Sequence, residues 1–171
     1  MNASTDYVTG KNHKITIRNY SVKDKNKVVE LLRLNIPTYF APEEEQDFNH
    51  YLENEIDLYY VLEFDEKIVG SGGINFKQDP ATGYISWDIL HPDFQGQGLG
   101  TLMLDYRIEK LKKTKKVSKI IVRTTQLVYK FYEKAGFKLV EEVKDYWAEG
   151  FDLHEMEYVK PKNIQNNYRP H

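Results

Sequence analysis

The sequence contains no cysteine among its 171 residues. That absence excludes disulfide bonds, thiolate metal sites and a cysteine nucleophile, and it fits a reducing compartment. The sequence also lacks an apolar run of the roughly 18 residues that a membrane helix requires, and residues 1–14 lack the apolar core of a signal peptide. We therefore expect a cytoplasmic protein that has no membrane partner.

Excess charge of one sign is also missing, since 24 basic and 26 acidic side chains leave a formal net charge of -2. No basic stripe interleaved with aromatic residues is present, so nucleic acid is not an expected partner. The 5 histidines are scattered, without an H-x-x-x-H pair or an acidic cluster at ligand spacing, and we expect no metal cofactor. The G-x-S-x-G elbow of serine hydrolases is absent as well.

What the sequence does contain is a regular succession of apolar patterns. Hydrophobic residues make up 40% of the chain and charged residues 29%, which is ordinary for a globular domain. Alternating or continuous short apolar runs predict strands, and apolar residues three and four apart predict helices. The predicted strands cover 15–18, 58–64, 67–76, 84–90, 119–124, 137–143 and 153–159, and the predicted helices cover 24–35, 42–55, 99–111 and 128–135.

These elements follow one another as strand, helix, helix, three strands, helix, strand, helix and two strands. This mixed order predicts an α/β fold of the α+β type, with a mostly antiparallel sheet of about seven strands flanked by about four helices. The length suits one domain with a single core. We expect that domain at residues 15–159, after a flexible leader at 1–14 and before a polar tail at 160–171.

The stretch from Phe94 to Thr101 contains three alternating glycines, Gly96, Gly98 and Gly100, between a predicted strand and a predicted helix. Glycine leaves backbone N–H groups accessible to a ligand, and the first N–H groups of a helix are unpaired at its positive end. These features favour a phosphate-binding loop, while a turn that packs a strand closely against a helix explains them equally well. The element order excludes a Rossmann loop, and the missing Lys-Ser or Lys-Thr excludes a P-loop.

Two motifs together resemble the GNAT acyltransferase superfamily. The first is Gln95-Gly96-Gln97-Gly98-Leu99-Gly100, which is similar to the loop signature of that family. The second is Tyr132-Glu133-Lys134-Ala135-Gly136-Phe137, which is similar to its Tyr-x-x-x-Gly-Phe helix end. The two motifs occur in the family's order, separated by one predicted helix and one predicted strand. The resemblance covers roughly residues 15–159 and implies a GNAT fold with acetyl-CoA as the cosubstrate.

The resemblance also implies how the cosubstrate is held. Backbone N–H groups from Gln95 to Thr101 would bind the pyrophosphate, and the N–H of Ile89 or Leu90 would polarise the thioester carbonyl. The family often has Asn where this chain has Thr125, whose hydroxyl would take over that contact. The predicted cofactor-binding residues are Ile89, Leu90, Gln95, Gly96, Gln97, Gly98, Leu99, Gly100, Thr101, Thr125 and Tyr132.

Two side chains are the predicted catalytic residues, Tyr132 and Asp88. Tyr132 matches the general acid of the family, and a pKa near 10 leaves a tyrosine protonated at neutral pH; its place on an apolar stripe with Phe131 also suits a core aromatic. Strand alternation puts Asp88 on one face with Tyr84 and Ser86. There Asp88 would accept the amine proton or bind the cationic amine, and a structural aspartate or a water-mediated route are the alternatives.

The resemblance implies an N-acetyltransferase that moves an acetyl group to a primary amine by direct attack in a ternary complex. The expected acceptor is a small-molecule or peptide amine, and a homodimer, which is common in this family, is a further expectation. The alternative is a non-catalytic acyl-CoA-binding or interaction module with the same fold. The predicted substrate-binding residues are Tyr39, Phe40, Tyr84, Ser86, Asp88 and Tyr146.

Overall fold

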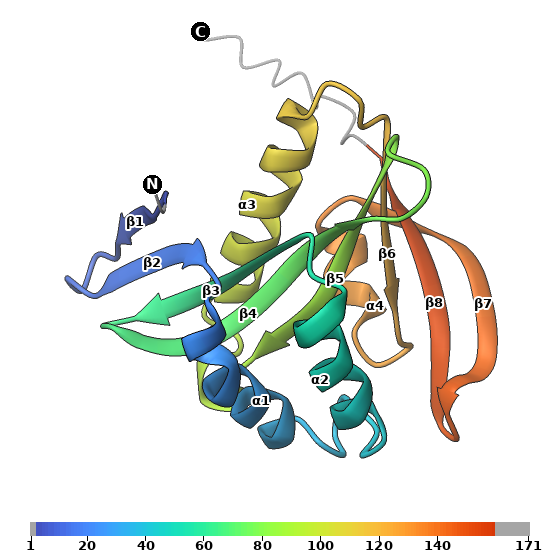
Figure 1. The fold of residues 1–171 in the computed structure, drawn as a ribbon, viewed down its shortest axis with the longest axis horizontal. Helices are drawn as coiled ribbons and strands as arrows, with labels where there is room; N and C mark the ends of the chain where they lie inside the picture. Colours follow the sequence, from blue (N-terminus) through green and yellow to red (C-terminus); the bar gives the residue numbers. More distant parts are fainter. Residues whose placement is uncertain (1–2, 160–171) are drawn as a thin grey trace, which may run out of the picture.

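The computed structural model describes residues 3–159, which form an eight-stranded sheet with helices on both faces (Figure 1). The strand order is β1-β2-β3-β4-β5-β6-β8-β7, and every neighbouring pair is antiparallel except β5 and β6. The strands are β1 (Thr5–Val8), β2 (Lys14–Asn19), β3 (Leu58–Phe64), β4 (Lys67–Phe76), β5 (Thr82–Leu90), β6 (Lys119–Thr124), β7 (Phe137–Ala148) and β8 (Phe151–Tyr158). The helices are α1 (Lys25–Leu34), α2 (Glu44–Asn54), α3 (Leu99–Lys113) and α4 (Tyr129–Lys134), with 3-10 turns at Val22–Asp24 and Pro92–Phe94.

The predicted α/β fold class is confirmed, with one strand more than expected. The additional strand, β1, lies within the segment that we expected to be a flexible leader. It pairs antiparallel with β2, and the Thr16 hydroxyl donates a hydrogen bond to Asp6 Oδ1 at 2.8 Å. A four-residue strand has too few side chains for a periodic signal, so its pairing partner decides its conformation. The predicted tail at 160–171 lies outside the described residues.

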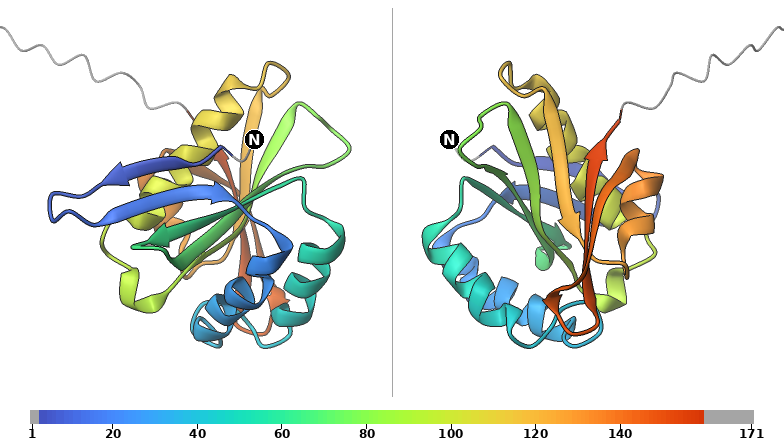
Figure 2. Two further views of the ribbon diagram at one scale, coloured as in Figure 1. Left: turned by 60° about the vertical axis from the view of Figure 1, so that its left-hand side comes forward. Right: turned by 90° about the vertical axis from the view of Figure 1, so that its right-hand side faces the viewer.

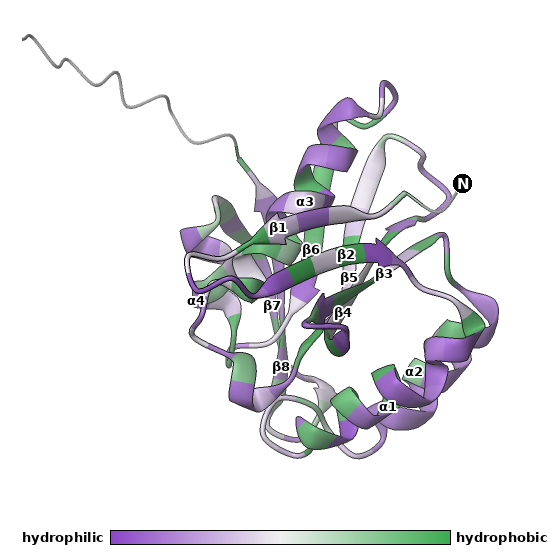
Figure 3. Cartoon of the chain, turned by 90° about the vertical axis from the view of Figure 1, so that its left-hand side faces the viewer, coloured by the Kyte–Doolittle hydropathy of each residue, from purple (hydrophilic) through white to green (hydrophobic). Residues whose placement is uncertain are grey.

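The helices form a layer on each face of the sheet, as the edge-on view in Figure 2 shows. α1 and α2 pack on one face, where Val28, Leu32 and Phe48 are fully buried in a cluster with Val61 of β3. α3 and α4 cover the other face around a second cluster that includes Leu104. Hydrophilic and hydrophobic segments alternate along α1 and α2 in Figure 3, as amphipathic helices require. None of the helices in residues 3–159 is long and apolar enough to cross a membrane.

The parallel neighbours β5 and β6 separate along their length. They pair only as far as Ile85 and Val122. Beyond that point β5 continues to Leu90 beside β4, while β6 continues to Thr124 beside β8. The sheet therefore splits at the carboxyl ends of two parallel strands, and ligands commonly bind at such an opening.

An irregularity in β5 changes which way its side chains point. The register between β4 and β5 shifts near Trp87, whose φ is 48°. Ile85 packs in the cluster under α3 and α4, whereas Ile89 packs in the cluster under α1 and α2, although strict alternation would put both on one face. The expectation that Asp88 shares a face with Ser86 is therefore wrong. Ser86 lies beside Tyr51 of α2, and Asp88 points toward α3, because an inserted residue breaks the period of two.

The glycines of β4 give a prediction for stability. A Cβ added at Gly73 would lie 2.6 Å from Tyr51 Oη, 2.7 Å from Tyr59 Cδ2 and 3.0 Å from the Leu58 carbonyl oxygen. We expect Gly73→Ala to lower the free energy of unfolding by about 1–3 kcal/mol through overpacking, measured by urea denaturation. Gly10→Ala is the matched control, because no atom lies within 4 Å of its added Cβ. Equal stability losses for the two variants would contradict the close packing described at Gly73.

Candidate active site

A cleft of about 940 Å³ opens where β5 and β6 separate. Its walls come from both helical layers, since residues of the α1–α2 connection line it on one side and residues of α3 and α4 on the other. Its volume falls in the range of small-molecule sites. Because the strands separate here, residues on the two faces of the sheet line one cleft.

The cleft brings together most of the residues that were predicted from the sequence. Three of those residues do not line it: the Leu99 side chain is buried in the core, Gln97 Nε2 donates to the Asp93 carbonyl oxygen at 3.1 Å, and Tyr146 of β7 is 48% exposed. The predicted residues that do line the cleft are Tyr39, Phe40, Tyr84, Ser86, Asp88, Ile89, Leu90, Gln95, Gly96, Gly98, Gly100, Thr101, Thr125 and Tyr132.

The glycine-rich loop has the conformation of an anion-binding turn. Gly96 and Gly98 have φ values of 72° and 80°, and Gly98 is the N-cap residue of α3. A Cβ at either position would meet no atom within 4 Å, so the requirement for glycine is conformational rather than steric. No side chain caps the 15-residue helix that follows, which leaves its first N–H groups and its positive dipole end facing the cleft. These features fit a bound phosphate group.

A buried asparagine, Asn35, ties this loop to the rest of the cleft. It is 3% exposed, and its Nδ2 donates to the carbonyl oxygens of Leu31 at 2.8 Å and Leu90 at 3.1 Å. Gln95 Nε2 donates to Asn35 Oδ1 at 3.4 Å, and the Tyr39 hydroxyl lies 3.5 Å from Gln95 Oε1. The end of α1, the end of β5 and the loop are therefore held in one network. The helix predicted over 24–35 ends at this asparagine, and the sequence pattern did not indicate its linking role.

Thr125 lies at the start of the turn that leads into α4. Its hydroxyl oxygen accepts the Leu127 N–H at 3.3 Å, and its carbonyl oxygen accepts the Tyr129 N–H at 3.1 Å. The residue is 9% exposed and lines the cleft. Its hydroxyl proton is still available to donate to a ligand, because an accepting oxygen keeps its own O–H.

Tyr132 of α4 and Asp88 of β5 meet inside the cleft. The Tyr132 hydroxyl donates a hydrogen bond to Asp88 Oδ2 across 2.5 Å. The other carboxylate oxygen, Oδ1, forms an ion pair with Nη2 of Arg107, a residue of α3. The structure thus places the two predicted catalytic residues in direct contact. Neither motif predicts this contact, which depends on the bulge in β5.

Arg107 is a site residue that sequence analysis missed. Its side chain is 1% exposed, and its Nε and Nη1 donate to the carbonyl oxygens of Met103 and Gly73, each at 3.1 Å. A Cβ added at Gly72 would lie 2.7 Å from Nη1, so glycine at that position lets the guanidinium reach the sheet. The sequence carries one signal for it, a charged residue within an otherwise apolar buried stripe. The other buried residues of α3 are Leu99, Met103, Leu104, Ile108 and Leu111.

The environment of Tyr132 keeps its hydroxyl protonated. Burial raises the pKa of Tyr132 well above the ordinary value of 10.0, and the negative charge of Asp88 raises it further, while the positive charge of Arg107 acts in the opposite direction. The residue is 4% exposed and packs in the core, yet its hydroxyl reaches the cleft. Tyr132 is therefore both a core aromatic and a protonated donor beside the cleft.

The half of the cleft near α1 and α2 is rich in aromatic rings. Phe40 stacks on Trp87 with ring centroids 6.1 Å apart, and Tyr39 lies next to it on the wall. Trp147 from the β7–β8 hairpin closes the opposite wall, and its Nε1 donates to the Thr124 carbonyl oxygen at 3.2 Å. The hairpin residue that lines the cleft is thus Trp147, and not the neighbouring Tyr146 that was predicted from the sequence. Aromatic faces of this kind can hold an amine substrate.

The chain is similar to known acetyltransferases in sequence. The model of the Acetyltransferase (GNAT) family matches residues 26–137. The amino-acid acetyltransferase of Pasteurella multocida (strain Pm70) is 30% identical over 134 residues, and the match covers 75% of this chain and 28% of that protein. The N-alpha-acetyltransferase of Sulfurisphaera tokodaii is 25% identical over 157 residues, covering 82% of this chain and 90% of that protein. This chain therefore spans less than a third of the first relative and most of the second.

Solved structures share the fold. An aminoglycoside 6'-N-acetyltransferase complexed with coenzyme A superposes with a TM-score of 0.66 at 16% sequence identity. The match covers 85% of this chain and 99% of that chain. At this level of identity the likeness shows the fold alone.

The ion pair between Arg107 and Asp88 gives a second stability prediction. Asp88→Asn leaves a buried guanidinium without its anion, and we expect it to lower the free energy of unfolding by about 2–4 kcal/mol. The value lies below the upper end for such pairs because 21% of the Asp88 side chain is exposed. Lys27→Gln, which breaks a pair whose side chains are 67% and 56% exposed, is the control and should have little effect. If Asp88→Asn and Lys27→Gln lose similar amounts of stability in urea denaturation, Asp88 does not compensate a buried charge as described.

Titration of Tyr132 gives a third prediction. Because the folded-state pKa of Tyr132 is raised, its contribution to stability is complete below about pH 10 and is lost as the pH rises toward the folded-state pKa. Above about pH 10 this tyrosine alone should make the free energy of unfolding fall by about 1.4 kcal/mol per pH unit. In urea denaturation at increasing alkaline pH, the free energy of unfolding of Tyr132→Phe should fall less steeply than that of the wild type, by that amount per pH unit. Parallel slopes for the variant and the wild type would show that Tyr132 titrates normally.

Proposed function

The chain belongs to the GNAT acetyltransferase family, and on that basis we propose that it transfers an acetyl group from acetyl-CoA to a primary amine by direct attack in a ternary complex. The observation that carries the proposal is the hydrogen bond between Tyr132 and Asp88, located where the two halves of the cleft meet. A protonated donor and a carboxylate acceptor in contact provide the two proton transfers that amide formation needs.

The loop side of the cleft fits the cosubstrate. The backbone N–H groups of Gln95 to Thr101 would hold the pyrophosphate at the start of α3, with the Thr125 hydroxyl as a further donor. Acetyl-CoA, when bound, supplies the acetyl thioester and leaves as the free thiol. The N–H of Ile89 or Leu90, at the separated end of β5, would stabilise the negative charge that develops on the carbonyl oxygen, an effect typically of a few kcal/mol.

Asp88 and Tyr132 supply the proton path in this proposal. The attacking amine must lose one proton as the C–N bond forms, and the departing sulfur must gain one as the C–S bond breaks. Asp88 takes the amine proton, directly or through water. Tyr132 donates its hydroxyl proton to the sulfur and regains one from Asp88 across their 2.5 Å hydrogen bond. Both side chains end in the protonation states in which they began.

The proposed acceptor is a small-molecule or peptide amine bound in the aromatic half of the cleft. Tyr39, Phe40, Tyr84 and Ser86 line that half. The names of the two relatives point to both kinds of acceptor, since one is an amino-acid acetyltransferase and the other an N-alpha-acetyltransferase. The alternative, a non-catalytic acyl-CoA-binding module, is less favoured, because simple binding has no use for a proton donor aligned with a fixed carboxylate.

The fourth prediction tests this function. Thiol release from acetyl-CoA is measured against a panel of amino acids, peptides and polyamines, and at least one amine should give turnover. Tyr132→Phe should lower kcat tenfold or more, in line with the loss of a general acid. Tyr129→Phe is the control in the same helix, because its ring packs on His154 rather than in the cleft. It should change kcat by less than about twofold.

Two outcomes would count against the proposal. If acetyl-CoA raises the melting temperature of the protein but no amine is acylated, the chain is a binding module. If amines are acylated and Tyr132→Phe is as fast as the wild type, the transferase assignment stands and the role of Tyr132 is wrong.

A further inference from the structure

Arg123 lies at the point where β6 leaves β5. It comes directly after Val122, the last residue of β6 that pairs with β5. Ile120 and Val122 pack in the core under α3 and α4. Alternation along the strand therefore turns the Arg123 side chain to the opposite face of the sheet, toward the half of the cleft near α1 and α2. Arg123 lines that cleft.

The guanidinium of Arg123 is held in place from three sides. Its Cζ lies 4.9 Å from the Tyr146 ring centroid and 5.6 Å from that of Trp147, and the two rings stand at 85° to each other. Its Nε lies 3.2 Å from Glu155 Oε2. A planar guanidinium fixed in this way loses little further freedom when it binds a ligand. The cluster also explains why Tyr146 lies outside the cleft, since it supports Arg123 from behind.

The contact with Glu155 uses only one edge of the guanidinium. Within residues 3–159, the two terminal nitrogens of Arg123 donate no hydrogen bond to a side chain or a carbonyl oxygen, and 26% of the side chain is exposed. These nitrogens form the end of the fork that matches the two oxygens of a carboxylate. Arg123 therefore presents a preorganised pair of donors on the cleft wall.

The lining of the cleft carries a further cation besides Arg123. This cation is Lys77, which follows β4 and has its Nζ 4.6 Å from the ring centroid of Tyr84. Three acidic side chains of the same lining are each held by a contact near α2. Glu44 accepts the Ala41 N–H at 2.7 Å, Glu55 lies 3.3 Å from His50, and Asp57 accepts the Phe76 N–H at 2.8 Å.

We infer that the acceptor amine carries a carboxylate, which Arg123 binds through its two terminal nitrogens. This inference rests on the proposed acetyl transfer and specifies its acceptor. The carboxylate belongs either to a free amino acid or to an acidic side chain near the amino terminus of a peptide. Both have the same chemistry, and an acceptor that carries only positive charge, such as a polyamine, lacks it.

The test compares acceptors that differ only in this group. The first pair is L-alanine and L-alaninamide, and the second is a C-terminally amidated tetrapeptide with Glu or Gln as its second residue. For each pair, the ratio of kcat/KM between the acid and the amide is measured for the wild type and for Arg123→Gln. Comparing the two proteins on the same acceptors cancels the intrinsic basicity of each amine. We expect the ratio in one pair to fall tenfold or more in Arg123→Gln, mainly through KM for the acid.

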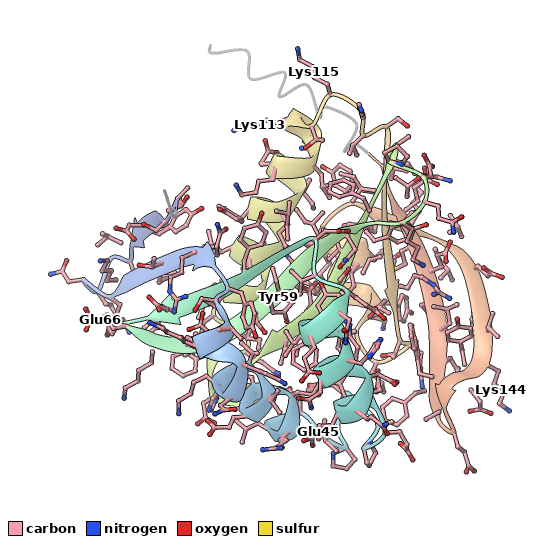
Figure 4. The ribbon with its side chains drawn as sticks, viewed as in Figure 1. Glu45, Tyr59, Glu66, Lys113, Lys115 and Lys144 are labelled. Atoms are coloured by element: carbon pink, nitrogen blue, oxygen red, sulfur yellow. The ribbon has the colours of Figure 1, made fainter. Side chains whose placement is uncertain are left out.

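A control and a second variant separate recognition from stability. Lys144→Gln also removes one positive charge, from β7 of the neighbouring hairpin, but Lys144 is exposed and does not line the cleft (Figure 4). It should keep the wild-type ratio. Glu155→Gln removes the carboxylate that competes for Arg123, so KM for the preferred acid should fall about threefold or more. If the contact between Arg123 and Glu155 only stabilised the fold, Glu155→Gln would instead lower the activity.

The pair that shows the preference identifies the source of the carboxylate. The inference is overturned if neither pair shows a ratio that depends on Arg123, or if Glu155→Gln raises KM for the acid at a normal melting temperature. The transferase proposal survives that result as long as any of these amines is acetylated. If none of these amines is acetylated but another amine of the wider panel is, the inference fails and the transferase proposal stands; if the folded wild-type protein acetylates no amine of that panel, the proposed function itself fails.

Discussion

A buried guanidinium must have its charge compensated, and in this protein that requirement fixes the centre of the molecule. Arg107 lies in the apolar core with 1% of its side chain exposed, and Asp88 is its anion. For Asp88 to reach it, β5 has to bulge at Trp87, and β4 has to carry glycine at Gly72. The same carboxylate then accepts the hydrogen bond of Tyr132. A constraint of folding stability thus orients the proposed proton donor.

The separation of β5 and β6 opens the cleft that Asp88, Arg107 and Tyr132 line. In an unbroken sheet, the side of α3 and α4 would be closed off from the side of α1 and α2. The loss of pairing beyond Ile85 and Val122 opens a passage whose lining belongs to both layers. On one side lie the glycine loop and the start of α3, which suit phosphate. On the other lie aromatic rings and Arg123, which suit an amine with a carboxylate. The contact between Tyr132 and Asp88 stands between them.

Local patterns in the sequence predicted a large part of this arrangement. The loop at Gln95 to Thr101 and the helix end at Tyr132 are contiguous motifs, and the main strands and helices have clear periodicity. Features that depend on distant contacts were not predictable in this way. The bulge at Trp87 turned Asp88 to the other face, and Arg107 has meaning only once Asp88 is beside it. Trp147 takes the cleft position expected for its neighbour because the hairpin packs on β6.

The central claim is that Asp88 and Tyr132 act as one proton-transfer unit, and a double-mutant cycle on kcat tests it most directly. Tyr132→Phe, Asp88→Asn and the double variant are compared with the wild type on one acceptor, after each is shown to be folded. Residues that act as a unit give strongly non-additive effects. The account predicts that the double variant is about as slow as the slower single variant. If the two losses in kcat multiply, the residues act independently and the account is wrong.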